Sequence, residues 1–292
     1  MAVETKAPSA IHTAAVLTQA EGGRAGEGLA AAIELARESG CKLVATADEL
    51  AKHPDSIASE LDEVDSLPRH PDLCLVFGGD GTILRGLRRY ARTTVPVYGI
   101  NYGTVGFLAA AEASDQEAAI GRALAADFNV LAMPALEVST ETEFPLAFND
   151  ASFTRLPHGR VAELSYRLGD QEVGRVRCDG LVASTPAGST GYNLANGGPI
   201  LAWGVEGFAV SFVAPHTLTA RALVVAPDDV LHVRNEGTRD PVDLSLDGLH
   251  VGELPAGEEV CVTFSDELAC LAQLPGSTFY SRIREKFGQL AH

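Results

Sequence analysis

The fold is decided by residues 73–82, which read Leu73-Cys74-Leu75-Val76-Phe77-Gly78-Gly79-Asp80-Gly81-Thr82. A continuous run of five apolar residues is typical of a strand that is covered on both faces, as in a parallel sheet. The glycines that follow permit a tight turn and let backbone N–H groups approach a ligand closely. Ile83, Leu84 and Leu87 then recur at helical spacing. The stretch therefore predicts a buried strand, a turn and a helix.

The segments on either side of this stretch repeat the same alternation. We expect strands near residues 14–17, 41–45 and 95–100, and a helix over residues 26–39 that ends at Gly40. Strand, helix and strand in this order favour a parallel sheet with covering helices. The sequence therefore predicts an α/β domain over residues 1–130.

The pattern changes after about residue 131. Short β-rich segments follow, separated by turn residues such as Gly169-Asp170 and Asp247-Gly248. We interpret residues 131–274 as a second, mostly β domain, and residues 275–292 as a C-terminal helix that packs on the first domain. Asp247-Gly248 on its own is typical of a hairpin turn.

Composition argues against several classes of protein. Lys and Arg total 22 against 39 Asp and Glu, so the formal charge of −17 disfavours a nucleic-acid partner. No apolar stretch reaches the length of a membrane span, and the N-terminus has no secretory pattern. The five cysteines form no Cys-x-x-Cys pair and indicate buried, reduced thiols rather than a zinc site or disulfides. These features predict a cytoplasmic protein that binds neither nucleic acid nor membranes.

The glycine-rich turn has the features of a phosphate cradle, because the helix after it points its N-terminus at the same place. An acidic residue there repels phosphate. Asp80 is easier to explain if it takes a proton from a hydroxyl or helps to hold Mg²⁺. The alternative, a plain turn in which Asp80 caps the helix, stays open from these residues alone. We interpret the arginines on the other helix face as solvated: Arg85, Arg88, Arg89 and Arg92.

Together, the motifs resemble those of the NAD kinases. Residues 78–82 are similar to the family's signature turn, which diacylglycerol and sphingosine kinases share. Further stretches narrow the resemblance: residues 99–108, the pair Asn149-Asp150, and the glycine-rich residues 179–192. The similarity covers most of the chain beyond Leu73. It implies transfer of the γ-phosphate of ATP, or of polyphosphate, to the 2′-hydroxyl of the adenosine ribose of NAD, which gives NADP.

The resemblance also implies roles for particular residues. Asp80 is the acid that takes the proton from the 2′-hydroxyl, and Mg²⁺ accompanies ATP. The residues implied at the phosphates are Gly78, Gly79, Gly81 and Thr82. Those implied at NAD, besides Asp80 and Gly81, are Phe107, Asn149, Asp150, Arg177, Asp179, Thr190, Gly191, Tyr192 and Ala195. Family members commonly form homodimers or homotetramers.

The residues alone leave other interpretations open. Phe107 also fits a core position, Asn149-Asp150 an ordinary turn, and residues 190–198 a loop with a helix cap. The chain departs from the family's usual residues at Glu163, Ala187, Gly191, Ala195 and Leu249, which leaves the preference for NAD or NADH open. Two other functions remain possible: a lipid kinase with the same turn, or an NAD-binding module without turnover.

Overall fold

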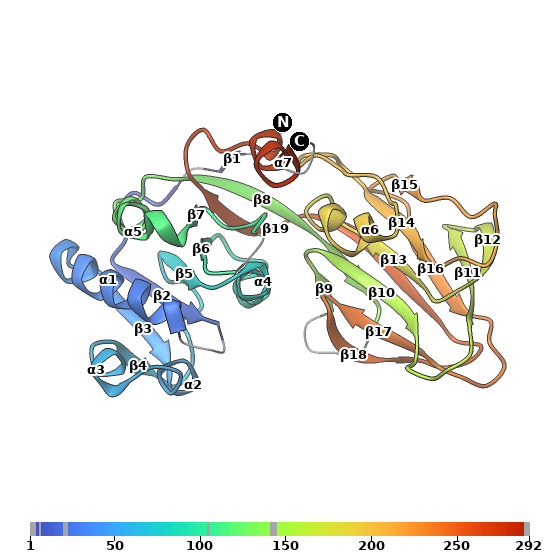
Figure 1. Ribbon diagram of the computed structural model, residues 1–292, viewed down its shortest axis with the longest axis horizontal. Helices are drawn as coiled ribbons and strands as arrows, with labels where there is room; N and C mark the ends of the chain where they lie inside the picture. The colour runs from blue at the N-terminus through green and yellow to red at the C-terminus, as the bar shows by residue number, and fades with distance from the viewer. Residues whose placement is uncertain (1–3, 6, 20–22, 104–105, 141–144, 289–292) are drawn as a thin grey trace. The chain divides into compact units, whose positions relative to one another are not determined.

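The computed structural model describes residues 4–5, 7–19, 23–103, 106–140 and 145–288, and Figure 1 labels their helices and strands. The chain divides into two compact units. Residues 134–267 form what we call the β unit, while residues 2–133 together with 268–292 form the α/β unit. The chain passes from one unit to the other within β8 (Asn129–Val138) and again within β19 (Glu259–Gln273).

The α/β unit is built on a parallel sheet with the strand order β19, β6, β5, β2, β3 and β4. Its strands are β2 (Thr13–Thr18), β3 (Lys42–Thr46), β4 (Asp62–Val64), β5 (Leu73–Phe77) and β6 (Pro96–Asn101), with the short β7 (Ala111–Glu112) beside β6. All residues of β5 are buried, as expected for a strand covered on both faces. The predicted parallel α/β sheet is confirmed.

Helices connect these strands. They are α1 (Gly23–Ser39), α2 (Ala47–Leu50), α3 (Asp55–Ala58), α4 (Asp80–Arg89), the 3₁₀ turn η1 (Ala113–Asp115) and α5 (Gln116–Leu124). Helix α1 buries Leu29, Ile33 and Ala36, the residues whose spacing predicted it. It ends before Gly40, whose φ of 70° is the left-handed conformation that glycine favours. Within the described residues, no helix is long and apolar enough to cross a membrane.

The β unit contains antiparallel strands in two groups. One group runs β12, β11, β16 and the first part of β19, and the other runs β15, β14, β13, β10, β17 and β18. The bounds are β9 (Leu146–Ala147), β10 (Asp150–Arg155), β11 (Ala162–Leu168), β12 (Gln171–Cys178), β13 (Gly180–Ser184), β14 (Phe208–Val213), β15 (Leu223–Val225), β16 (Leu231–Asn235), β17 (Val242–Leu246) and β18 (Leu249–Leu254). Leu164 and Val233 of the first group share one buried cluster with Phe153 and Phe208 of the second. The predicted mostly β fold is confirmed.

The turn between β17 and β18 is Asp247-Gly248. Both residues have positive φ, 49° and 74°, as the two central residues of a type I′ hairpin turn do. The hairpin predicted at this pair is confirmed. The positive φ of Asp247 is less favourable for aspartate than it would be for glycine or asparagine.

The C-terminal helix α7 (Phe279–Phe287) returns to the α/β unit, as the sequence predicted. A capping box at Thr278 and Ser281 starts the helix, because each side chain accepts a backbone N–H from the other residue. Arg282 of α7 donates to the side chain of Gln273, and Lys286 Nζ lies 3.0 Å from Glu112 Oε1. The charges of Arg282 and Lys286 also act on the Asp80 carboxyl, so α7 lies near the glycine-rich turn.

Candidate active site

The glycine-rich turn follows β5 directly, and its N-cap residue for α4 is Gly79 rather than Asp80. The Asp80 carboxylate does not cap the helix. It instead accepts hydrogen bonds from the backbone N–H groups of Phe107 and Leu108, at 2.9 and 3.1 Å. The structure therefore rules out the capping interpretation and shows an acid that is held by a second loop.

The glycines of the turn differ in the space around them. A Cβ atom on Gly78 would lie 2.5 Å from Thr82 Oγ1, so any other residue would force the Thr82 side chain to shift. The backbones of Gly79 and Gly103 face one another, since a Cβ on Gly103 would lie 3.4 Å from the Gly79 Cα. At Gly81 the same test meets open space. The turn is thus packed on one side and accessible on the other, as a cradle for a ligand must be.

The pKa of the Asp80 carboxyl is set by its burial and by the groups around it. Burial raises the pKa of the Asp80 carboxyl above the ordinary aspartate value. The N–H groups of Phe107 and Leu108 oppose this, as do the charges of Arg282 and Lys286 on α7. A carboxylate with a raised pKa is a better proton acceptor, which suits a general base.

Phe107 is buried, and its ring centroid lies 5.6 Å from that of Phe287 on α7. Phe107 therefore occupies a core position, one of the two interpretations that the sequence left open. Contact of this ring with an adenine stays a prediction. The same packing connects α7 to the loop that holds Asp80.

A cluster of charged side chains beside the turn was not predicted. Glu49 is buried, and its carboxylate accepts from the Thr18 backbone N–H at 2.9 Å, Lys52 Nζ at 2.9 Å and Arg85 Nη2 at 2.7 Å. Thr18 ends β2 and pairs with Phe77, the last residue of β5. The cluster therefore lies at the carboxyl edge of the sheet, where ligands of open α/β sheets bind.

Arg85 of α4 is partly exposed and Arg89 is exposed, as the solvated-face interpretation expects, but both also have partners that it did not include. Arg85 bonds Glu49 and the Thr18 carbonyl, and Arg89 donates to the Leu67 carbonyl. The spacing on α4 could not reveal this, because the partners lie 22 to 67 residues away in the chain.

In the β unit, the pair Asn149-Asp150 is held by Asp247. The Asp247 carboxylate accepts three successive backbone N–H groups, from Phe148 at 3.2 Å, Asn149 at 2.6 Å and Asp150 at 3.2 Å. Burial, and secondly the charge of Asp247, raises the pKa of Asp150 to about 7. The pair is therefore held by a carboxylate from a distant hairpin, which an ordinary turn would not need.

The glycine-rich residues 185–195 pack against the same pair. Thr185 N donates to the Asn149 carbonyl at 2.9 Å, and a Cβ on Gly188 would lie 2.0 Å from that carbonyl oxygen. The short turns η2 (Gly188–Thr190) and α6 (Tyr192–Ala195) follow. At Gly191 a Cβ would lie 3.3 Å from the Gly188 carbonyl oxygen, so the family's usual alanine would need only a small adjustment.

Asp179 and Tyr192 belong to this surface as well. After burial, the charges of Asp150 and then Asp179 raise the pKa of Tyr192, so the three side chains lie near one another. Asp179 Oδ1 is also 2.8 Å from Arg155 Nε, a partner that the sequence did not predict. Arg177 lines a cavity of about 460 Å³ together with Arg155.

Within the α/β unit the structure thus brings together Asp80, the glycine turn and Phe107. Within the β unit it brings together Asn149, Asp150, Asp179 and residues 188–195. Asp247, which holds the second group, was predicted only as a hairpin residue, and Glu49, beside the first group, was not predicted at all.

Two family models match the chain: the ATP-NAD kinase N-terminal domain over residues 26–128 and the ATP-NAD kinase C-terminal domain over residues 148–274. An NAD kinase of Symbiobacterium thermophilum is 38% identical over 221 residues, covering 74% of this chain and 78% of the relative. An NAD kinase of Rhodopirellula baltica is 32% identical over 245 residues, covering 82% and 79%.

Solved structures share the fold. Yeast NADH kinase complexed with NADH has a TM-score of 0.83 at 20% identity and covers 97% of this chain and 89% of its own. An NAD kinase from Archaeoglobus fulgidus in complex with ATP has a TM-score of 0.72 at 23% identity, with coverage of 95% and 98%. The matched domains and the curated relatives together show that the chain belongs to the NAD kinase family.

Proposed function

We propose that the chain phosphorylates NAD at the 2′-hydroxyl of its adenosine ribose, with ATP as donor, to give NADP. The observation that carries this proposal is the position of Asp80. Its carboxylate is held by two backbone N–H groups at the mouth of a glycine turn, and its pKa is raised by burial. The membership of the NAD kinase family supports NAD as the acceptor.

The proposed reaction is a direct in-line transfer. The ribose 2′-oxygen forms a bond to the γ-phosphorus while the bond from that phosphorus to the β,γ-bridging oxygen breaks. The electron pair leaves with ADP, and Asp80 receives the hydroxyl proton. Because the transition state of such transfers is loose, most of the rate enhancement comes from positioning and charge neutralisation.

Mg²⁺ fits this site as an ion that arrives with ATP. Mg²⁺ usually keeps several waters and is held largely by substrate phosphates, and the turn offers the Thr82 hydroxyl close to where the phosphates would lie. When bound, the ion would neutralise charge on the transferred phosphoryl group. Gly78, Gly79 and Gly81 would face the phosphates with their backbones.

The β unit would hold NAD. An amide and a carboxylate side by side, as at Asn149-Asp150, suit a ribose diol because they offer both donors and acceptors. Residues 190–195 would line the dinucleotide with Arg177 and Asp179, and Phe107 would contact the adenine. We further propose a cytoplasmic homodimer or homotetramer, and residues 1–130, 131–274 and 275–292 as its functional segments.

The direct test is incubation of the purified chain with NAD, ATP and Mg²⁺, followed by detection of NADP by mass spectrometry. Formation of NADP supports the proposal, and parallel reactions with NADH and with polyphosphate define acceptor and donor. Phosphorylation of diacylglycerol or sphingosine in place of NAD would instead identify a lipid kinase. Binding of NAD without any product would identify a module that has lost turnover.

A further inference from the structure

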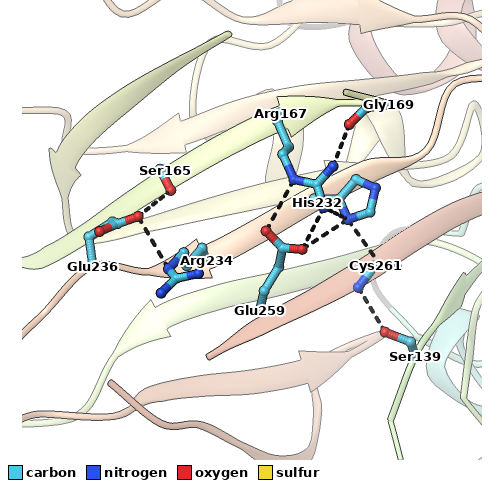
Figure 2. Close-up of polar contacts among 9 residues, drawn as sticks. All are labelled: Ser139, Ser165, Arg167, Gly169, His232, Arg234, Glu236, Glu259 and Cys261. Carbon is cyan, nitrogen blue, oxygen red and sulfur yellow. Dashed lines mark hydrogen bonds and ion pairs between the residues drawn. The ribbon is translucent and has the colours of Figure 1, made fainter. Parts of the chain in front are cut away.

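Three potential metal ligands lie together on one face of the β unit, on a different group of strands from Asn149-Asp150. His232 on β16 and Cys261 on β19 are directly opposite one another in the strand register, and Glu259 precedes Cys261 by two residues on the same face. Figure 2 shows their side chains converging with that of Arg167. Cys261 is partly exposed, unlike the other four cysteines, which are buried.

The distances among the three donor atoms suit a metal centre. Cys261 Sγ lies 3.2 Å from His232 Nδ1, and Glu259 Oε1 lies 3.1 Å from the same nitrogen. All the donor atoms are within 4.8 Å of one another. A tetrahedral zinc ion places neighbouring N, O and S ligands about 3.4 to 3.6 Å apart. The two distances to His232 Nδ1 are therefore within a few tenths of an ångström of those around a zinc ion.

The orientation of the imidazole also suits a cation. Arg167 Nη2 lies 2.9 Å from His232 Nδ1, and a guanidinium N–H can only donate. Nδ1 also lies 3.1 Å from Glu259 Oε1, which can only accept, so Nδ1 donates to Glu259 in one tautomer and accepts from Arg167 in the other. In both tautomers Nδ1 faces the cluster, as it must in a metal ligand. Arg167 Nη2 is also 2.8 Å from Glu259 Oε1 (Figure 2). The guanidinium thus occupies the place where a positive ion would be bound.

A metal ion would have to displace Arg167, so the strength of the Arg167 contacts must be compared with the affinity of the three ligands for a metal. The Arg167–Glu259 pair is about one third exposed on each side, at 34% and 27%. The pair is bidentate, since Arg167 Nε also donates to Glu259 Oε2 at 3.2 Å, which places its contribution at the upper end of the range for exposed pairs, about a fivefold factor in an equilibrium. Thiolate, imidazole and carboxylate ligands bind Zn²⁺ with much larger constants. The Gly169 carbonyl, 2.6 Å from Arg167 Nη1, offers the displaced guanidinium a remaining partner.

We propose that His232, Glu259 and Cys261 form a binding site for a thiophilic divalent cation such as Zn²⁺, which displaces Arg167 from the cluster. The Cys261 thiol loses its proton to solvent as the sulfur–metal bond forms, and a water completes the four ligands. The ion would fasten β16 to β19. The site is separate from the proposed NAD kinase reaction, because its residues have no place in that mechanism.

Titration of the metal-free full-length chain with Co²⁺ tests the proposal, since thiolate–cobalt bonds give a charge-transfer absorption that oxygen and nitrogen ligands do not. We expect one Co²⁺ per chain with this absorption, which one equivalent of Zn²⁺ removes. Cys261→Ser should abolish the absorption, while Cys41→Ser should retain it. His232→Ala and Glu259→Gln should weaken binding by about tenfold or more.

Two further variants separate a real site from chance binding. Arg167→Gln should strengthen Zn²⁺ binding by up to about fivefold, because it removes the competing cation. Glu172→Gln changes a carboxylate in the same shallow cavity of about 430 Å³ and should have no effect. Equal thermal unfolding of the variants in chelator would show that they are folded. Absence of the absorption in the wild type, or its persistence in Cys261→Ser, would overturn the proposal.

Discussion

Asp247 and Asp150 are joined by two hydrogen bonds: the Asp247 side-chain Oδ1 accepts the Asp150 N–H at 3.2 Å, and the Asp247 backbone N–H donates to the Asp150 carbonyl at 2.8 Å. The hairpin turn is thereby fastened to the pair proposed to bind the NAD ribose. Two carboxylates are also brought close together. The charge of Asp247 contributes, after burial, to the raised pKa of Asp150.

This arrangement predicts how kcat/KM for NAD depends on pH. The Asp150 pKa is about 7, so the ionised form that accepts hydrogen bonds is lost as the pH falls through 7. In Asp247→Asn the repelling charge is removed, the Asp150 pKa falls, and the acidic limb of the profile should move to lower pH. Burial still acts on Asp150, so the shift is partial. Asp243→Asn, in the same hairpin, should leave the limb in place, and an unmoved limb in Asp247→Asn would separate Asp150 from NAD binding.

Asp80→Asn should lower kcat about 10²- to 10⁴-fold, because the amide cannot take the hydroxyl proton. Its affinity for NAD, measured by calorimetry, should change little. The matched control is Asp115→Asn, an exposed residue of η1 in the same unit. Turnover of Asp80→Asn close to that of the wild type would remove Asp80 from the chemistry.

Glu49→Gln should destabilise the protein by about 1 to 3 kcal/mol, since Lys52, Arg85 and Thr18 would lose a buried charged acceptor. Urea unfolding measures the difference. Glu60→Gln removes a carboxylate of similar chemistry from an exposed pair with Arg37, and should cost less than about 1 kcal/mol. Equal effects at both positions would mean that the Glu49 cluster adds no more stability than the exposed Arg37–Glu60 pair.

Gly188→Ala and Gly191→Ala should differ sharply although both lie in the same turn region. The added Cβ would meet the Asn149 carbonyl oxygen at 2.0 Å in the first variant, and the Gly188 carbonyl oxygen at 3.3 Å in the second. We expect Gly188→Ala to lower stability by several kcal/mol. Gly191→Ala should stay within about 1 kcal/mol of the wild type in thermal unfolding.

The sequence predicted the fold well because its local patterns agree with the final structure. The apolar run of β5, the spacing of Leu29 and Ile33 on α1, and the Asp247-Gly248 turn each specify their own conformation. The glycine turn could likewise be placed after a strand from its own residues. Local pattern and tertiary structure point to the same answer in these segments.

What the sequence did not reveal are contacts between distant residues. Asp247 looked like a hairpin residue, and nothing in its neighbourhood showed that its carboxylate would accept N–H groups about 98 residues earlier in the chain. Glu49 and Arg85 were similarly separated. Periodicity describes which face of an element is buried, but it does not describe which polar group meets which.

The division of the α/β unit between residues 2–133 and 268–292 has a consequence for synthesis on the ribosome. Strand β6 cannot pair with its parallel neighbour until β19 has been synthesised. The Leu108 carbonyl, which follows an N–H group that holds Asp80, likewise lacks the Gln273 amide that donates to it at 2.8 Å. The first unit to begin translation is therefore the last to be completed. Until residues near 273 emerge, the sheet that carries Asp80 lacks β19, and the unpaired edge of β6 is open to aggregation.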